Sequence, residues 1–505
     1  MSASDSAATP HPVAAALRAV GLAVAATAVP VNPWVLGALR EYPVNYADVM
    51  QTYMVAAITV GGLLVGAGAA VRRRPQWAAV GLLILAVAAI AMADRALLAY
   101  WGLPHWISDS RLDYRQRPSS ERVNTAHNAR VRGTRISINR HGFHDGEFPV
   151  AKPPGQTRIL FLGDSVTMGW GVERGLTFSS RTQALLQSTG AIVRTINAGV
   201  EGYAARQERL MFEECLVFAP DRVVLGFVMN DVTDPLVQGR QGFWGFYRAS
   251  SDALGYLASE TGVGRTLQKY RQARFERAAR DAGRMGAFVA ADAADPRFAG
   301  AWRDALAHIR AMNENCRGRG IRFALVVFPE THQLFRPERQ EPQRILRDFA
   351  ARHGVDFLDL TPAFENFLTA AINARFGPEQ LPLAPARFRE MADVMATAFF
   401  LDEVHLSDAG HQAVAILLAE RFGLADLGLQ PRALTRTLNE AARLTLEPVV
   451  RMPAEIDRVW RHGQALTDMG YTDAACAFYG KARERFARAR TTLDARMRQL
   501  ACGPL

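Results

Sequence analysis

Five residues of the types that acyl transfer needs lie in four separate segments of the chain. Ser165 is in GDSVTMG, Gly202 in NAGVEGY and Asn230 in MND, while Asp402 and His405 share LDEVHL. A serine hydroxyl is a poor nucleophile at neutral pH and needs a base, which His405 can provide. Asp402 precedes His405 by three residues, close enough to fix the imidazole tautomer. The pattern predicts a serine nucleophile, a histidine base and an orienting aspartate; an ordinary surface pair is the alternative interpretation of Asp402 and His405.

The same segments supply donors for the negative charge that develops on the substrate oxygen. The candidates are the backbone amides of Ser165 and Gly202 and the side-chain amide of Asn230, because preorganised N–H groups stabilise an oxyanion. Gly202 has no Cβ and permits close approach. Alternatively, Ser165 caps a helix, Gly202 serves a turn and Asn230 bridges loops. Gly199 is a second candidate for the glycine donor.

Two further pairs carry reactive side chains near these segments. We predict that Asp408 is the N-cap of a helix over 409–422, with His411 in its first turn. Glu330 and His332 could line the pocket, but a surface loop is the favoured interpretation.

The elements that must position these residues follow an α/β pattern. Short apolar, β-branched segments alternate with helical stretches, which indicates a parallel sheet covered on both faces. Loops at the carboxyl ends of such strands are where sites form. The predicted strands are 158–163, 191–197, 222–228, 322–328 and 355–360, and helices include 203–218, 298–317 and 343–353.

Together these segments resemble the SGNH hydrolases, also called the GDSL family, from about residue 158 to 422. The resemblance implies a three-layer α/β/α flavodoxin-like domain with Ser165 as nucleophile and Asp402 and His405 completing the triad. It also implies an oxyanion site of the Ser165 amide, Gly202 and Asn230, with no metal and no organic cofactor. Thr167 stands where a G-x-S-x-G elbow would have its second glycine, which argues against the α/β-hydrolase fold.

A second resemblance concerns the segment before the first strand. Residues 138–145 (INRHGFHD) are similar to an N-x-x-G-F segment that precedes GDS in membrane-tethered SGNH proteins of bacterial envelopes; WGV at 170–172 and Thr177-Phe178 extend the likeness. Such proteins often accompany the making or O-acylation of surface polysaccharides.

Three uncharged stretches near the N-terminus, 19–39, 50–71 and 75–93, approach the length of about 20 apolar residues that crosses a bilayer. The first is interrupted by prolines; a cleaved signal peptide is its alternative, although the preceding residues lack Lys and Arg until Arg18. The arginines at 72–74 predict a cytoplasmic loop. We therefore expect two to three transmembrane helices, a multi-pass protein in the cell membrane, and the catalytic domain on the extracytoplasmic, periplasmic side.

The predicted organisation has four regions and one insertion. They are a membrane region at 1–104, an extracytoplasmic, irregular connector at 105–156, the hydrolase domain at 157–425 with an insertion at 232–296, and a helical region at 426–505. The last region resembles a single tetratricopeptide hairpin, with a plain helical hairpin as the alternative. One such repeat cannot bury its own apolar face, so it would pack on the main domain or bind an envelope protein partner.

Composition excludes several other classes. The net charge is +10, but only three residues are lysine and no basic run alternates with aromatics, so no nucleic-acid partner is expected. Four distant cysteines without a CxxC motif argue against a structural zinc site.

We therefore predict a membrane-anchored extracytoplasmic serine esterase that cleaves small acyl esters, with O-acetyl groups on envelope or extracellular glycans as the favoured substrate. A lipid ester is an alternative substrate. An O-acyltransferase of a surface polysaccharide would use the same Ser-His-Asp site, and a non-catalytic scaffold of an envelope assembly is a further alternative. The expected partners are the acyl ester or acylated glycan and, through the N-terminal helices, a lipid bilayer.

Overall fold

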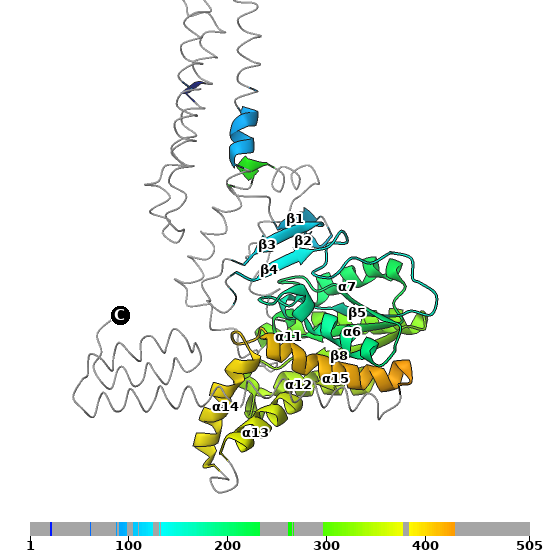
Figure 1. Cartoon of the computed structure of the whole chain (residues 1–505), viewed down its shortest axis with the longest axis vertical. Helices are drawn as coiled ribbons and strands as arrows, with labels where there is room; N and C mark the ends of the chain where they lie inside the picture. Colours follow the sequence, from blue (N-terminus) through cyan, green and yellow to red (C-terminus); the bar gives the residue numbers. More distant parts are fainter. Residues whose placement is uncertain are drawn as a thin grey trace, which may run out of the picture. The chain divides into compact units, whose positions relative to one another are not determined.

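The computed structural model describes residues 21–22, 61, 87, 90–97, 105–109, 111–124, 131, 133–232, 261–264, 266, 296–376 and 383–429. The chain divides into two units (Figure 1). One comprises 1–114 and 241–284, and the other comprises 115–240 and 285–505. The predicted hydrolase domain lies in the second unit. Most of the predicted insertion at 232–296 and of the C-terminal region at 426–505 lies outside the described residues.

The prediction of a multi-pass membrane protein with a periplasmic catalytic domain is corrected by the structure. No helix among the described residues is long and apolar enough to span a membrane. Around the third apolar stretch, the described residues 90–97 are helical and include Asp94 and Arg95. Asp94 Oδ1 accepts a hydrogen bond from the backbone N–H of Val263, at 3.2 Å. Nearly all of the stretches 19–39, 50–71 and 75–93 lies outside the described residues.

The second unit is built on a five-stranded sheet with the order β6-β5-β7-β8-β9. All neighbouring strands are parallel; Leu160 of β5, for example, pairs with Ile196 on one side and Val223 on the other. The predicted five strands and their parallel arrangement are confirmed. In chain order the sheet reads 2-1-3-4-5, the flavodoxin-like order. The strands are β5 (Thr157–Leu162), β6 (Val193–Asn197), β7 (Arg222–Phe227), β8 (Arg322–Val327) and β9 (Asp356–Asp359).

Helices cover both faces of this sheet (Figure 1). Phe161 of β5 shares a core with Phe178 and Val414 of two helices on one face. On the other face, Phe227 of β7 stacks on Trp302, with ring centroids 6.0 Å apart. The first layer contains α6 (Phe178–Ser188), α13 (Thr361–Phe376), α14 (Pro385–Phe399) and α15 (Asp408–Leu427), and the second contains α7 (Ala205–Cys215), α11 (Pro296–Gly318) and α12 (Glu341–His353).

A buried charge network lies at the end of the sheet where the strands begin. The guanidinium of Arg222, at the start of β7, donates to Asp426 Oδ1 at 2.7 Å and to Asp356 Oδ2 at 2.9 Å. The side chains of Arg222 and Asp426 are each only 5% exposed. Because Asp426 belongs to the last turn of α15, this network attaches the end of that helix to the sheet.

The segment before the sheet, predicted to be irregular, contains short strands. They are β1 (Trp106–Asp109), β2 (Asp113–Gln116), β3 (Ser120–Val123) and β4 (Arg135–Ile138). β3 and β4 form an antiparallel hairpin in which Ser120 pairs with Ile138. β3 alternates between half-buried and exposed residues, and such short polar strands lack the apolar pattern by which strands are recognised.

The N-x-x-G-F segment turns the chain from this hairpin toward β5. Asn139 Oδ1 accepts from the backbone N–H groups of His141 and Phe143, at 2.9 and 3.0 Å. Further on, the buried guanidinium of Arg158 donates to the backbone carbonyls of residues 149–151 and Phe218. The segment is therefore fixed to the catalytic unit by buried polar contacts.

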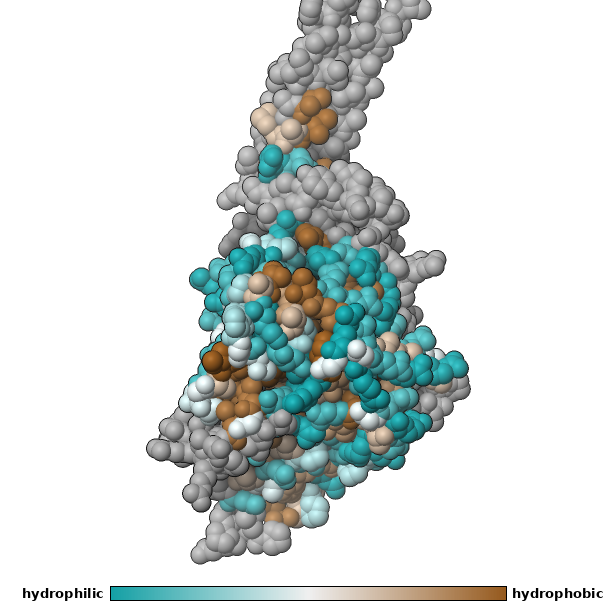
Figure 2. Space-filling model, turned by 90° about the vertical axis from the view of Figure 1, so that its right-hand side faces the viewer, coloured by the Kyte–Doolittle hydropathy of each residue, from teal (hydrophilic) through white to brown (hydrophobic). Residues whose placement is uncertain are grey.

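The described surface on one side of the molecule is largely hydrophilic, with hydrophobic patches between the polar residues (Figure 2). Exposed large apolar side chains include Val123, Ile192 and Val217. A surface of this kind is ordinary for a globular domain.

Candidate active site

Three loops at the carboxyl ends of neighbouring strands approach one another. They follow β5 at Gly163–Ser165, β6 at 198–204 and β7 at 228–231. The backbone N–H of Val200 donates to Gly163 O at 3.1 Å, and Asn230 Nδ2 donates to Asp164 Oδ2 at 2.6 Å. The residues at 198–204 are called the β6–α7 loop below.

The structure brings Ser165, His405 and Asp402 into one hydrogen-bonded chain. Ser165 Oγ lies 2.8 Å from His405 Nε2, and His405 Nδ1 lies 2.7 Å from Asp402 Oδ2. The serine and the histidine are 240 positions apart in the sequence. Ser165 Oγ can therefore give its proton to Nε2 while Asp402 holds the opposite ring nitrogen.

The turn that carries Asp402 and His405 is held by hydrogen bonds within the turn itself. Asp402 Oδ1 accepts from the N–H groups of Val404 and His405 at 2.9 and 2.8 Å. Leu401 N–H donates to His405 O at 2.7 Å, and an antiparallel bridge joins Phe400 to Leu406. A spacing of three residues thus lets one carboxylate bind both the turn's amides and the imidazole.

Charges around the imidazole favour its protonated form. Burial by itself opposes charge on both partners. Nevertheless, the pKa of His405 is raised above its usual value, chiefly by Asp402 and further by Asp164 and Glu201. Burial is likewise outweighed at Asp402, where the imidazole and the hydrogen bonds to the turn lower the carboxyl pKa to about 2. Asp402 therefore stays ionised, and an imidazolium formed during reaction is stabilised.

Trp170 lies against the imidazole. The two ring centroids are 4.5 Å apart and the planes are inclined by 41°. The backbone N–H of Trp170 donates to Ser165 O at 2.9 Å, so the indole is fixed by the same turn that presents the serine. The indole limits rotation of the His405 ring and presents an apolar surface beside it.

Asp164 links the nucleophile to Asn230. Its Oδ1 accepts from Val166 N–H at 2.9 Å, which makes Asp164 the N-cap of the one-turn helix α5 (Ser165–Met168). Its Oδ2 accepts from Asn230 Nδ2 and, at 3.3 Å, from Ser165 Oγ. Burial raises the pKa of Asp164, against the effect of these hydrogen bonds. Ser165 is therefore the first helical residue and not the cap; an Asp directly before the serine at a strand-to-helix junction was the signal available in the sequence.

The two glycines of the β6–α7 loop differ in what their amides do. Gly199 N–H donates to Asn197 Oδ1 at 3.2 Å, and a Cβ on Gly199 would lie 2.3 Å from the backbone nitrogen of Met168. Gly199 is therefore required for close packing, and its amide is occupied. Gly202 has φ +72°, and neither its amide nor that of Ser165 donates to an acceptor within the described residues.

Asn230 begins a helical turn after β7, with its side chain held toward the nucleophile by Asp164. One N–H of the side-chain amide binds Asp164, which leaves the second N–H for a ligand. Its Oδ1 is buried and lacks a hydrogen-bond partner among the described residues. The amides of Ser165 and Gly202 and this second N–H form a candidate set of oxyanion donors.

Behind Asn230 lies a buried pair of carboxyl groups, Glu208 of α7 and Asp231. Burial raises the pKa of both groups well above the usual value, and the negative charge of Asp164 adds to the effect. Both oxygens of Glu208 and Oδ1 of Asp231 lack a hydrogen-bond partner among the described residues, so an ionised form of either carboxyl is poorly compensated. Sequence gave no signal for this pair, because its members are brought together only by the fold.

His411 and Asp408, which look catalytic in the sequence, do not join the triad. His411 is buried, its Nδ1 accepts from Phe178 N–H at 3.1 Å, and burial lowers its pKa to about 3. The prediction that Asp408 is the N-cap of α15 is wrong by one residue. Ser407 is the cap, since its Oγ accepts from Gly410 N–H at 3.2 Å, and Asp408 is the first helical residue.

Glu330 is buried instead of lying on a surface loop, so that expectation is corrected. Its Oε2 lies 3.2 Å from His332 Nδ1. The backbone N–H of Thr331 donates to Glu403 O at 2.9 Å, which joins this loop to the catalytic turn. Burial, reinforced by Glu403 and by two carboxyl groups of the site, raises the pKa of Glu330 to about 8, so that its carboxyl is largely protonated at neutral pH.

A flavodoxin-like sheet with a serine, a histidine and an aspartate at its carboxyl edge defines the class of α/β serine hydrolases. Residues 161–413 match the GDSL-like lipase/acylhydrolase family, and the chain belongs to this family. It is thus an ester-cleaving serine hydrolase, as the sequence motifs predict.

Two solved structures are similar to part of this chain. An acetyl xylan esterase is 18% identical, with 53% of this chain and 99% of that one covered and a TM-score of 0.30. A catalytic mutant of an acetylxylan esterase from Geobacillus stearothermophilus is 18% identical, with 56% and 94% covered and a TM-score of 0.28. No curated protein matches the chain.

Proposed function

We propose that this hydrolase removes short acyl groups, acetyl above all, from hydroxyl groups of a glycan. Ser165 is the nucleophile, His405 the general base and acid, and Asp402 the residue that orients the imidazole. The observation that supports this assignment is the hydrogen-bonded chain from Ser165 Oγ through both nitrogens of His405 to Asp402 Oδ2, at 2.8 and 2.7 Å.

In the first half of the reaction, Ser165 Oγ attacks the ester carbonyl carbon and its proton passes to His405 Nε2. The electron pair of the C=O π bond moves onto the carbonyl oxygen. The resulting oxyanion accepts hydrogen bonds from the amides of Ser165 and Gly202 and from Asn230 Nδ2. Donors held in place before the reaction need no reorganisation when the charge appears.

In the second half, the tetrahedral intermediate collapses and the bond from carbon to the alkoxy oxygen breaks. His405 Nε2 gives its proton to the departing alcohol, leaving an acyl ester on Ser165. Water then attacks this ester with His405 again as base, and the collapse of the second intermediate releases the carboxylic acid and restores the serine hydroxyl.

The groups around the nucleophile favour a small acyl group and a hydroxylated alcohol. In the described part of the chain, Ser165 Oγ is bordered by Asp164 and His405, and Asn230 binds the carboxylate of Asp164. These polar groups suit a short acyl chain better than a long apolar one. The indole of Trp170 beside His405 offers a ring face to a sugar.

The test compares the full-length chain with its Ser165→Ala variant. Release of p-nitrophenol is measured from acetyl, butanoyl and octanoyl esters, and acetate release is measured from an acetylated oligosaccharide. We expect turnover to fall with chain length and to disappear in Ser165→Ala. Equal turnover by the two proteins would rule out the catalytic assignment, and acyl transfer to an added acceptor glycan instead of acetate release would favour the acyltransferase alternative.

A further inference from the structure

We infer that the segment preceding the catalytic sheet is part of the active site: Gln116 and Arg122 are positioning residues that fix the β6–α7 loop and thereby aim the Gly202 amide. This inference rests on the proposed role of Gly202 as an oxyanion donor. Residues 161–413, which define the family match, include neither Gln116 nor Arg122.

Two buried contacts connect this segment to the loop. Gln116 Nε2 donates to Gly199 O at 3.0 Å, and Gln116 is only 3% exposed. Arg122 Nη2 lies 2.7 Å from Glu201 Oε2, and these two side chains are 13% and 8% exposed. The contacts hold the residues on either side of Val200, and Gly202 directly follows Glu201.

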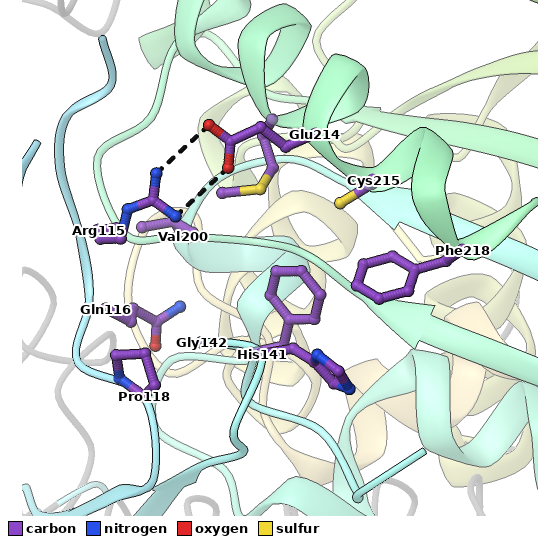
Figure 3. A pocket seen from close by; sticks show the side chains of 11 residues that line it. Arg115, Gln116, Pro118, His141, Gly142, Val200, Glu214, Cys215 and Phe218 are labelled. Carbon is purple, nitrogen blue, oxygen red and sulfur yellow. Dashed lines mark hydrogen bonds and ion pairs between the residues drawn. The ribbon is translucent and has the colours of Figure 1, made fainter. Parts of the chain in front are cut away.

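These contacts lie where the loop borders a cavity. Val200 lines a pocket of about 120 Å³ together with Gln116, Met211 and Phe218. Figure 3 shows Gln116 and Val200 among the side chains that line this pocket, together with the ion pair of Arg115 and Glu214. Apolar packing fixes a side chain only where partner atoms are present. Where the loop borders the pocket, the polar contacts of Gln116 and Arg122 therefore add to the backbone bond between Val200 and Gly163 in fixing its position.

A small displacement of this loop would be costly for an oxyanion donor. The amide must lie within hydrogen-bond distance of the developing charge in the transition state. A displacement of about 1 Å in a catalytic group can reduce the rate by about 10²-fold. Gln116 and Arg122 touch the loop and not the reacting atoms, so their removal should lower kcat and leave KM unchanged.

Arg122 has a second, electrostatic effect on the same site. The carboxyl groups that face His405 come from three elements: Asp402 from its own turn, Asp164 from the N-cap of α5 and Glu201 from the β6–α7 loop. The guanidinium of Arg122 offsets the charge of Glu201. Replacing Arg122 by a neutral residue increases the negative charge that the imidazole experiences, and neutralising Glu201 decreases it.

The experiment uses the full-length chain and the uncharged substrate p-nitrophenyl acetate. Arg122→Met and Gln116→Met should each lower kcat by about 10- to 100-fold at constant KM, and Arg122→Lys should recover part of the loss. The matched control is Arg135→Met. Arg135 lies on the same β3–β4 hairpin and pairs with Glu121 at 3.4 Å, but both side chains are mostly exposed. This control should behave like the wild type.

The pH profile of kcat/KM distinguishes positioning from a general loss of structure. The reaction needs neutral His405, so activity falls on the acidic side of the histidine pKa. Arg122→Met should move this acidic limb to higher pH, and Glu201→Gln should move it to lower pH. A merely destabilised fold would not shift the limb in opposite directions in the two variants.

Two results would overturn the inference: Arg122→Met matching Arg135→Met in kcat, or a raised KM with unchanged kcat, which would make Arg122 a substrate-binding residue. If Arg122→Met fails to fold, as judged by thermal melting, Gln116→Met and Glu201→Gln decide the question in the same assays. The proposed function fails separately, when wild type and Ser165→Ala have equal turnover.

Discussion

In the proposed mechanism, the catalytic turn at 401–407 and the β6–α7 loop contribute to the same reaction, but they are held in different ways. The turn is fixed by its own atoms, through the amides that bind Asp402 and the bridge between Phe400 and Leu406. The loop has a backbone bond to Gly163, but it is also held by side chains from a distant part of the sequence, Gln116 and Arg122. A turn held mainly by its own atoms can be recognised as a short motif, whereas a loop that depends on distant side chains cannot.

The largest effect is expected from changing the turn's own carboxylate. Asp402→Asn should reduce kcat by about 10⁴-fold, because the imidazole loses the partner that fixes its tautomer. The loss of negative charge also lowers the pKa of His405, so the acidic limb of kcat/KM, measured between pH 5 and 9, should move to lower pH. A loss of less than tenfold would contradict the role of Asp402.

A smaller but still large effect is expected at Asn230, on the side of the oxyanion donors. Asn230→Ala should lower kcat by about 10²- to 10³-fold with little change in KM, because one donor to the transition state is removed. Steady-state kinetics with p-nitrophenyl acetate measures this. An increase in KM alone would show that Asn230 binds the substrate in its ground state.

The next prediction concerns the contribution of the buried carboxyl groups of Glu208 and Asp231 to the stability of the fold. A carboxyl group with a raised folded-state pKa stabilises the fold at low pH, and this contribution is lost as the pH rises through that raised pKa. Glu208→Gln should remove the pH dependence of stability that Glu208 causes, so the variant should gain more stability at pH 8 than at pH 5. The difference should be about 1.4 kcal/mol for each unit by which the fold raises the pKa of Glu208. Denaturant unfolding at the two pH values provides the comparison; an equal effect at both would show that the pair is ionised throughout.

The smallest effect concerns the cap of α15, directly after the catalytic turn. Ser407→Ala should lower the free energy of unfolding by about 1 kcal/mol, because Ser407 Oγ caps the helix. Asp408→Ala, the matched change one residue later, should cost less, since Asp408 is exposed and its pairing with Arg181 lies at the surface. If Asp408→Ala were the more damaging change, the assignment of Ser407 as the cap would be wrong.

The sequence was sufficient for the sheet because its three central strands, β5, β7 and β8, are nearly continuous apolar runs, as strands covered on both faces need. It was also sufficient to single out Ser165, Asp402 and His405, which the structure joins in one hydrogen-bonded chain. The roles of Gly202 and Asn230 as oxyanion donors stay predictions.

The rest depends on contacts between residues far apart in the chain. Glu330 was expected at the surface, because its burial comes from the packing of its loop against the catalytic turn. The strands before β5 are too short and too polar to show a strand pattern, and so Gln116 and Arg122 could not be connected with the site. Uncharged stretches alone led to the multi-pass prediction that the described helices contradict.

The ion pairs of Arg222 bear on where this enzyme can be shortened. The last turn of the helix that follows the catalytic turn contains Asp426, whose side chain is 5% exposed. It binds Arg222 at the end of the sheet where the strands begin. Ending the polypeptide before that aspartate would take one of two carboxylate partners from a buried guanidinium, and breaking a buried ion pair typically costs about 3–5 kcal/mol. A protein that ends after Leu427 keeps this ion pair. We therefore expect a truncated esterase to keep its catalytic turn in place only if Asp426 is retained.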